Sequence, residues 1–272
     1  MKEQKTTTSR QQRRFLQRSF KPLTNSQWEI IKNLLDKPRK RKHSLRNVLD
    51  GILKITRTGT QWRNLDSCFP PWELVYYYFR KWQKKGVLTF ILNHLVGLER
   101  VRQERNVSPT TCAVDSQSVK IAAFINEEVG IDGFKKINGR KRHIAVDSLG
   151  LPLAIHVSAA NTYDGNEGIE LFSQLEEVAS ELEIIFADSA YKGYFKECAA
   201  WYKWKVEITQ RPPNEKGFVP QKGRWQVERS FGWFNFFRRL AKDYEKTIQS
   251  SVAFIQSVFI TIILARLDRE NF

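Results

Sequence analysis

The sequence has little of what zinc proteins and disulfide-bonded secreted proteins need. Its 272 residues include 3 cysteines and 4 histidines. Cys68, Cys112 and Cys198 form no C-x-x-C pair, and the histidines form no H-x-x-x-H or H-x-E pattern. The pattern therefore favours neither a zinc site nor a disulfide framework, and it predicts a reducing cytosol as the environment of the protein.

Long apolar runs are also scarce. The longest, residues 252–264, is shorter than the roughly 20 residues of a membrane-spanning helix, and it contains Gln256, Ser257 and Thr261. We expect it to form a buried closing helix. The basic N-terminus has no apolar segment behind it, so we predict neither a secretory signal nor a membrane partner.

The sequence also has few acidic residues relative to basic ones. It contains 29 Asp and Glu residues and 45 Lys and Arg residues, which gives a formal charge of +16. Residues 1–58 hold 16 basic and 4 acidic residues, a local charge of +12. Such a field attracts polyanions. Nucleic acid is the favoured partner, with an anionic membrane surface or an acidic protein as alternatives. The DNA-contacting residues predicted here are Arg39, Lys40, Arg41, Lys42 and Arg46.

The first part of the chain is predicted to be a basic arm followed by short helices. Residues 1–20 contain few apolar side chains and are expected to be a disordered arm. Residues 21–102 are predicted to form a mostly helical DNA-binding region. Its helices are expected to begin at Thr24 or Ser26 and at Ser44, and then to cover residues 72–82 and 87–102.

From Pro109 onwards the sequence alternates in a way typical of strands, which predicts a domain boundary near residues 103–110 and a second domain over residues 109–268. The predicted order is βββαβαβα, which implies a mixed sheet with helices on its faces, as in the RNase H-like fold. The strands are expected at 111–119, 141–147, 153–157, 183–187 and 205–209, and the helices at 168–181, 194–201 and from Gly223 onwards.

Three acidic residues stand where this fold would use them. Asp115 lies inside the first strand, Asp188 directly follows the buried strand that ends at Ala187, and Glu228 lies on the last helix. A buried carboxylate is costly unless something compensates its charge, and a metal ion commonly does so. If the first and fourth strands pair in parallel, both aspartates reach neighbouring carboxyl ends of the sheet, where open sheets bind ligands.

A purely structural explanation of these acids stays open. Asp115 and Asp188 could be strand-end turn formers, and Glu228 a solvated helix residue. Asp147 and Asp164 are weaker candidates because both lie in turn or helix-cap contexts. Oxygen ligands alone suit Mg²⁺, with Mn²⁺ as a substitute. Two such ions, about 3.5–4 Å apart, can activate a hydroxyl nucleophile and stabilise the leaving oxygen of a phosphodiester.

Residues from about Leu23 to Leu267 resemble bacterial insertion-sequence DDE transposases of the insertion-sequence-five type. The resemblance implies Asp115, Asp188 and Glu228 as the catalytic, metal-binding acids. It also implies an Arg four residues before the glutamate, which is Arg224. The motifs that carry the resemblance are 59–65 (GTQWRNL), 113–116 (AVDS), 135–143 (KKINGRKRH), 187–193 (ADSAYKG) and 224–233 (RWQVERSFGW).

Two positions depart from the family pattern around the glutamate. Where the family has a Tyr and a basic residue, this chain has Gln221 and Asn235, and Arg238 and Arg239 are the expected substitutes for the missing charge. A basic stretch next to the first strand is predicted to contact DNA phosphates, with a solvated charge run as the alternative. Its basic residues are Lys135, Lys136, Arg140, Lys141 and Arg142.

These features together predict a DNA transposase. It would bind terminal inverted repeats, cleave them with two Mg²⁺ ions per active site, and join the freed 3′-hydroxyl ends to target DNA. Synapsis of two ends predicts a homodimer or a larger oligomer, and the expected location is the nucleoid in the cytoplasm of a prokaryotic cell. The alternatives are an RNase H-like nuclease that cuts without joining and a domesticated DNA-binding relative.

Overall fold

The computed structural model describes residues 20–35, 39–209 and 223–268. The predicted disordered arm, with Arg13, Arg14 and Arg18, therefore lies outside the described residues, as does Gln221.

The N-terminal helices begin where the sequence predicts. Helix α2 (Asn25–Ile31) starts after Thr24, whose side chain accepts a hydrogen bond from the Gln27 backbone while the Gln27 side chain returns one to Thr24, a capping box. A short 3₁₀ turn, η1 (Lys32–Leu34), follows it. Helix α3 (Leu45–Thr58) is capped by Ser44 and ends at Gly59, whose φ of 71° lies in the left-handed region that favours glycine. After η2 (Trp62–Asn64), helices α4 (Trp72–Lys84) and α5 (Val87–Arg102) complete this region.

The predicted mixed sheet is confirmed. Strand β1 pairs antiparallel with β3 and parallel with β5, and β5 pairs parallel with β6. The order along the sheet is β2-β3-β1-β5-β6, and β4 also pairs with β3. The strands are β1 (Thr111–Lys120), β2 (Gly130–Asp132), β3 (Ile137–Asp147), β4 (Pro152–Ala159), β5 (Ile184–Ala187) and β6 (Lys205–Ile208).

Two strand predictions need correction. No sequence pattern predicted β2, and β3 begins at Ile137 rather than at Lys141. The basic residues of this stretch were expected to contact DNA phosphates where the chain leads into a strand, whereas Arg140, Lys141 and Arg142 lie within β3 itself. Gly139 allows the close pairing, because an added Cβ would lie 1.9 Å from the Val119 carbonyl oxygen of β1.

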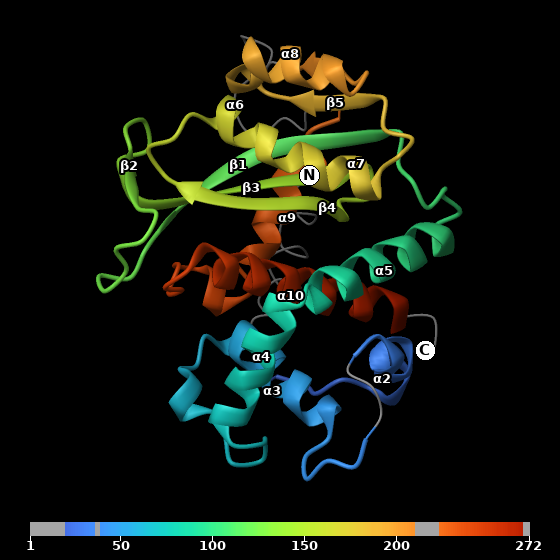
Figure 1. The fold of residues 1–272 in the computed structure, drawn as a ribbon, viewed down its shortest axis with the longest axis vertical. Coiled ribbons are helices and arrows are strands. Elements are labelled where there is room, and N and C mark those ends of the chain that lie inside the picture. Colours follow the sequence, from blue (N-terminus) through green and yellow to red (C-terminus); the bar gives the residue numbers. More distant parts are fainter. Residues whose placement is uncertain (1–19, 36–38, 210–222, 269–272) are drawn as a thin grey trace, which may run out of the picture.

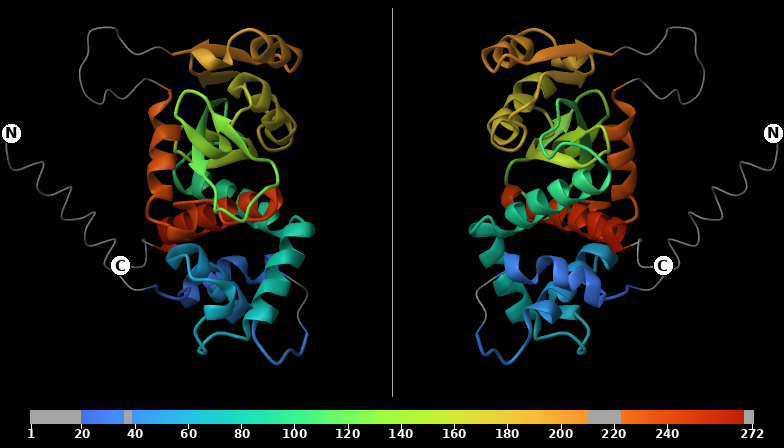
Figure 2. Two further views of the ribbon diagram at one scale, coloured as in Figure 1. Left: turned by 90° about the vertical axis from the view of Figure 1, so that its left-hand side faces the viewer. Right: turned by 90° about the vertical axis from the view of Figure 1, so that its right-hand side faces the viewer.

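Helices cover both faces of the sheet, with α7 and α9 on opposite sides (Figure 2). The single helix expected over 168–181 is instead three short pieces that start earlier and end at Val178, and the long helix expected from Gly223 is interrupted after Phe234. The elements are α6 (Asp164–Glu167), η3 (Gly168–Leu171), α7 (Phe172–Val178), η4 (Ser189–Tyr191), α8 (Tyr194–Trp201), α9 (Trp225–Phe234), η5 (Arg238–Leu240) and α10 (Ile248–Leu267).

Helix α10 is the predicted closing helix. By length and hydropathy it could cross a membrane, but 67% of its most apolar window is buried inside the protein. It packs against α3, α4 and α5 on one side and against β4 on the other, and Figure 1 shows it between the sheet and the N-terminal helices. The two predicted regions therefore share one continuous hydrophobic core.

A buried ion pair also joins the two regions. Arg100 of α5 binds Asp147 at the end of β3, and both side chains are almost fully buried. Asp147 Oδ1 also accepts hydrogen bonds from the backbone nitrogens of Leu149 and Leu151, at 2.9 and 2.8 Å, so it shapes the turn into β4 as the sequence predicts.

We predict that Asp147→Ala lowers the free energy of unfolding by about 3–5 kcal/mol, because it leaves the Arg100 guanidinium buried without its carboxylate. Urea denaturation measures the change. Glu207→Ala is the matched control, since its ion pair with Lys205 is largely exposed and contributes about 0–1 kcal/mol. Equal losses in the two variants would contradict the structural role of the Arg100–Asp147 pair.

Candidate active site

Parallel pairing of β1 with β5 brings two of the predicted acids together. The last paired residues are Ala113 on β1 and Phe186 on β5. Asp115 and Asp188 each lie two residues further along in the same direction, so the register carries both to the same place at the edge of the sheet. The parallel arrangement on which the sequence-based prediction depended is confirmed.

Asp115 is held from two sides. Its Oδ1 accepts a hydrogen bond from the Ser116 backbone nitrogen at 2.8 Å, and its Oδ2 accepts one from Arg224 Nη2 at 3.1 Å. Burial raises the pKa of this carboxyl to about 6, although Arg224 pulls the pKa down. Asp188, whose negative charge is close by, adds to the increase.

Asp188 and Glu228 reach the same point from other elements. Asp188 caps η4, where its Oδ1 accepts a hydrogen bond from the Ala190 backbone nitrogen at 2.8 Å. Glu228 lies in the first turn of α9, at the end where helix N-termini favour negative charge. Their side chains are 36% and 31% exposed, against 17% for Asp115, so the site is open to solvent on their side.

One guanidinium nitrogen lies close to all three acids. Arg224 Nη2 is 3.1 Å from Asp115 Oδ2, 3.9 Å from Asp188 Oδ2 and 3.8 Å from Glu228 Oε1. The contact with Glu228 joins residues four positions apart at the start of α9, whereas the contacts with the two aspartates come from the fold. The Arg224 side chain is 9% exposed, so the carboxylates offset the cost of burying its charge.

A glycine permits this placement of Arg224. Gly223 has a φ of 83°, and an added Cβ would lie 2.6 Å from the Phe186 ring on β5. The chain can therefore pass close to β5 immediately before α9 begins, and Arg224, the N-cap residue of α9, is directed towards the acids.

Tyr191 is a neighbour of the site that the sequence-based prediction missed. It is fully buried, and its pKa is raised well above the ordinary value by burial and by the charges of Asp115, Asp164 and Asp188. The signal was present in the motif at 187–193, where a Tyr follows Asp188 by three residues. Asp164 lies near Tyr191, since its charge contributes to the raised pKa of that side chain. Lys141 Nζ is 2.8 Å from Asp164 Oδ1.

Several predicted DNA-contacting residues are used inside the protein. Arg140 and Arg142 are buried: Arg140 donates to the Glu245 and Glu127 carbonyl oxygens and pairs with Asp243, while Arg142 donates to the Leu240 carbonyl oxygen. The expectation of phosphate contact is corrected for these two residues because their side chains are buried inside the protein. The same correction applies to Lys141, which binds Thr162 and Asp164, and to Arg239, which binds Glu245.

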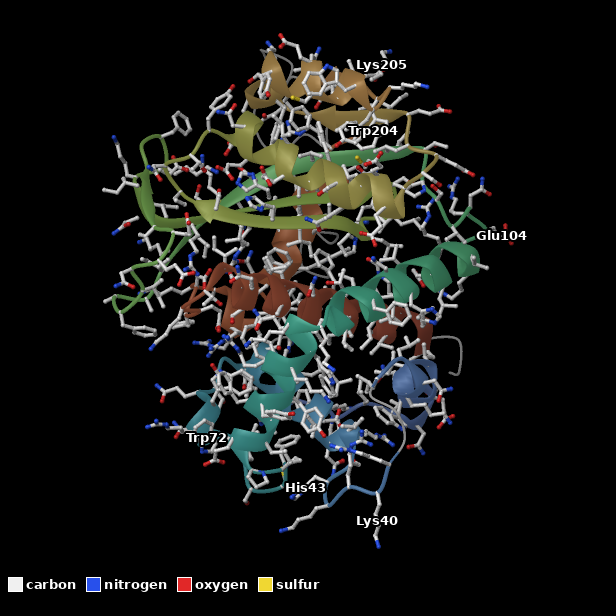
Figure 3. All side chains as sticks on the ribbon, viewed as in Figure 1. Lys40, His43, Trp72, Glu104, Trp204 and Lys205 are labelled. Carbon is white, nitrogen blue, oxygen red and sulfur yellow. The ribbon has the colours of Figure 1, made fainter. Side chains whose placement is uncertain are left out.

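Other basic residues remain accessible. Arg46 is half-buried and donates to Asn25 Oδ1 and the Leu23 carbonyl oxygen, and Arg41 is half-buried too. Figure 3 shows Lys40 extending outward from the loop before α3, at the opposite end of the molecule from Lys205. The exposed members of the predicted set are Arg39, Lys40, Lys42, Lys135, Lys136 and Arg238.

Within residues 20–35, 39–209 and 223–268, no three acidic, histidine or cysteine side chains stand close enough together to hold a metal ion as they are placed. The three acids are grouped around the Arg224 guanidinium rather than directly against one another. Their oxygen donors are of the kind that Mg²⁺ and Mn²⁺ prefer.

Comparison with protein families matches almost the whole described chain. The model described as "Putative transposase of IS4/5 family" matches residues 23–92, and the model described as "Transposase DDE domain" matches residues 107–264. The chain is similar to the "Putative transposase for insertion sequence element IS402" of Burkholderia cepacia, with 26% identity over 125 residues. That alignment covers 43% of this chain and 59% of the relative, which is less than two thirds of the relative's length.

Solved structures give a weaker similarity. The magnesium-bound catalytic core domain of the HTLV-2 integrase in its trimeric form has a TM-score of 0.33 and 18% identity, covering 55% of this chain and 86% of that one. The catalytic domain of Mos1 mariner transposase has a TM-score of 0.35 and 10% identity, covering 64% and 87%. Similarity at this level does not identify site residues, so the site residues are assigned from the contacts within this structure.

We predict that Arg224→Met raises the pKa of the Asp115 carboxyl further above its value of about 6, because the guanidinium that lowers it is removed. Carbon-13 NMR titration of labelled aspartate measures this pKa. Arg229→Met is the control on the same helix, since the Arg229 guanidinium lies over the rings of Trp225 and Trp233. An unchanged Asp115 pKa in Arg224→Met would show that the contact is absent in solution.

Proposed function

The chain belongs to the family of transposase DDE domains, and from this premise we propose that it is a DNA transposase whose catalytic acids are Asp115, Asp188 and Glu228. It binds the terminal inverted repeats of its element, hydrolyses a phosphodiester at each end, and joins the freed 3′-hydroxyl to target DNA. One observation carries the assignment of the acids: a single nitrogen of Arg224 lies within 3.9 Å of a carboxylate oxygen from each of them.

This convergence is specific to these three residues. They come from a strand, from the turn after a second strand and from a helix, so no local feature of the sequence groups them. A structural role for each acid alone would not require the three to share one point. Burial raises the pKa of the Asp115 carboxyl to about 6, and a cation beside it favours its charged form.

Divalent cations fit the donor set. Asp115, Asp188 and Glu228 would hold two Mg²⁺ or Mn²⁺ ions, and these would activate the attacking hydroxyl and stabilise the leaving oxygen. The Arg224 guanidinium lies between the three carboxylates, so it marks a place where positive charge is stabilised. The Arg224 side chain would have to move aside for the acids to hold metal ions there.

Arg224 is also suited to binding a phosphate. Its planar fork suits two oxygens of one phosphate, whereas a lysine ammonium would give a point charge. Since Arg224 begins α9 beside Glu228, a modest side-chain movement keeps it next to the acids. We propose that it binds a phosphate of the strand that is being cut.

DNA recognition is assigned to the N-terminal helices and the exposed basic loop before α3. Arg39, Lys40 and Lys42 are exposed there, and helices of this length can enter a major groove. Synapsis of two ends requires a homodimer or larger oligomer. The protein is proposed to act on the nucleoid in the cytoplasm of a prokaryotic cell.

Two alternatives share the site but differ in outcome. A nuclease of the same fold would hydrolyse DNA without joining ends, and a domesticated relative would bind DNA without cutting it. Incubation of the protein with Mg²⁺, element ends and target DNA separates the three, since only a transposase yields joined products.

We predict that Asp115→Asn, Asp188→Asn and Glu228→Gln each lower cleavage by at least ~10³-fold, because a metal ion contributes several kcal/mol to the transition state. Each variant keeps its affinity for end DNA, since that affinity comes from basic surface. Gel assays of cleavage and binding measure both quantities. Glu197→Gln on α8 is the control with an acid outside the site. Normal cutting by one of the three variants would remove that residue from the catalytic group.

We also predict that Arg39→Gln with Lys40→Gln reduces the slope of log K against log salt by up to roughly 1.8, through loss of two phosphate contacts. The test uses the full chain, because α10 forms part of the core of the N-terminal helices. Lys203→Gln with Lys205→Gln is the control that removes the same charge, and Figure 3 shows Lys205 at the far end of the molecule from Lys40. A slope that changes equally in both variants would assign the effect to net charge alone.

A further inference from the structure

A hairpin beside β1 carries large apolar side chains that nothing in the described structure covers. Phe134 is 94% exposed, and Phe124 and Ile131 are 63% and 62% exposed. All three lie between the end of β1 and the start of β3. Figure 1 shows β2 and the loop that precedes it extending from one side of the molecule. The three residues belong to one short segment of the chain, and exposed apolar side chains of this size are candidates for contact with a partner.

The tip of this hairpin is firmly built. Asp132 Oδ1 accepts hydrogen bonds from the backbone nitrogens of Phe134 and Lys135, at 3.0 and 2.9 Å, and its Oδ2 accepts one from the Ser118 hydroxyl. The Lys136 backbone nitrogen donates to the Asp132 carbonyl oxygen at 2.8 Å. The Phe134 ring is therefore presented to solvent from a fixed turn, which reduces the entropy lost when it inserts into a partner.

An open hollow of about 630 Å³ lies at the base of this hairpin. Three lysines line it, Lys120, Lys136 and Lys242, together with the amides of Asn126 and Asn138. Glu127 and Glu128 belong to the preceding loop but are not among the lining residues. Four apolar residues complete the lining: Ile121, Ala123, Ile125 and Val129. The hollow thus combines apolar side chains with positive charge and amide donors, and the charge and the donors suit the phosphates of a nucleic acid.

The hollow lies further along β1 than the catalytic Asp115. Strand β1 pairs with β5 only as far as Ala113, and the next described partner on that edge is Asp243, which bridges Ile121. Asp115 stands near the first end of this stretch, and Lys120 and Lys242 stand at the other. Five residues of strand separate the backbones of Asp115 and Lys120, a rise of about 17 Å along the axis of β1, which equals about five nucleotide steps along duplex DNA. Because side chains alternate along a strand, those of Asp115 and Lys120 leave β1 on opposite faces, so this separation is the one between the two ends of the strand segment.

We propose that this hollow and hairpin, defined by Lys120, Lys136, Lys242 and Phe134, hold the DNA about five nucleotides from the bond that is cut. The lysines bind the backbone, and the Phe134 ring enters between two bases. An apolar wedge of this kind unstacks a base step and bends the duplex, which positions the neighbouring strand. The inference rests on the proposed transposase function. It adds which surface binds the DNA beside the acids and how that surface contacts it.

The positive charge of this surface favours DNA over a second copy of the chain as its partner. Two copies that met through this surface would bring lysines against lysines, and like charges across an interface oppose association. A polyanion with stacked bases satisfies both features of the surface, because it supplies phosphates for the lysines and an apolar stack for the ring.

The first test measures the salt dependence of binding by the full chain to a mixed-sequence duplex, in chelator and without cleavage. Lys120→Gln, Lys136→Gln and Lys242→Gln together should lower the slope of log K against log salt by about 0.9 for each lost phosphate contact. The matched control is Lys196→Gln, Lys203→Gln and Lys205→Gln. Equal slopes in the two variants would overturn the assignment of the hollow. Because this test needs no cutting, it decides the hollow even if the proposed catalytic function fails.

The second test places 2-aminopurine at successive steps on both sides of the cleavage site mapped with the wild-type protein. Its fluorescence should rise at one step about five nucleotides from the cut bond. Phe134→Ala should abolish that rise and weaken binding roughly 5- to 100-fold, while Phe134→Leu, which keeps an apolar wedge, should restore both.

Trp201→Ala is the control for the second test, because Trp201 is a 78% exposed aromatic residue on α8. No step-specific rise with the wild-type protein, or the same rise with Phe134→Ala, would overturn the wedge. A smaller oligomer by light scattering in Phe134→Ala with unchanged DNA fluorescence would overturn it too, and would assign the ring to contact between copies. Absence of any cutting by the wild-type protein would count against the proposed function itself.

Discussion

Three carboxylates close to one another repel, and the structure of the site depends on the single guanidinium that offsets this repulsion. Arg224 contributes one nitrogen to Asp115, Asp188 and Glu228 at once. The arrangement requires the parallel register of β1 and β5, the turn capped by Asp188 and the close approach of Gly223 to Phe186. A change in any of these would separate the charges, and each separated carboxylate or guanidinium would then need solvent or another partner.

Other buried arginines are also paired with carboxylates. Arg100 binds Asp147 between α5 and β3, Arg140 approaches Asp243, and Arg239 binds Glu245. A chain with a formal charge of +16 thus places part of its positive charge inside, where acids and carbonyl oxygens satisfy it. Exposed basic residues remain on the loop before α3, around Phe134 and elsewhere on the surface, including Lys196, Lys203 and Lys205.

The elements that the sequence predicted well are those with local signals. Thr24 and Ser44 cap their helices, Gly59 ends one, and the alternation after Pro109 marks β1. The parallel neighbours Asp115 and Asp188 also followed, because element order alone constrains which strands pair. The misplaced residues were the basic ones of β3. A run such as Arg140 to Arg142 has the same composition on a surface and in an interior, and partners such as Leu240 and Asp243 reach it only through the fold. Neither β2 nor the contact of Arg224 with two aspartates has a local signal, because both arise from chain segments brought together only by the fold.

Under the proposed function, the position of Arg224 links two binding events. Bound metal ions would compete with the guanidinium for the same three carboxylates, so the Arg224 side chain would have to move away from them. Moving the guanidinium away from the acids is costly while it stays buried without another anionic partner. A DNA phosphate beside the acids would supply that partner and lower this cost. Because coupling between two ligands is reciprocal, DNA that binds Arg224 would then strengthen metal binding, and metal binding would strengthen the contact of Arg224 with DNA. The guanidinium that offsets the repulsion of the three acids would therefore also make metal binding depend on bound DNA.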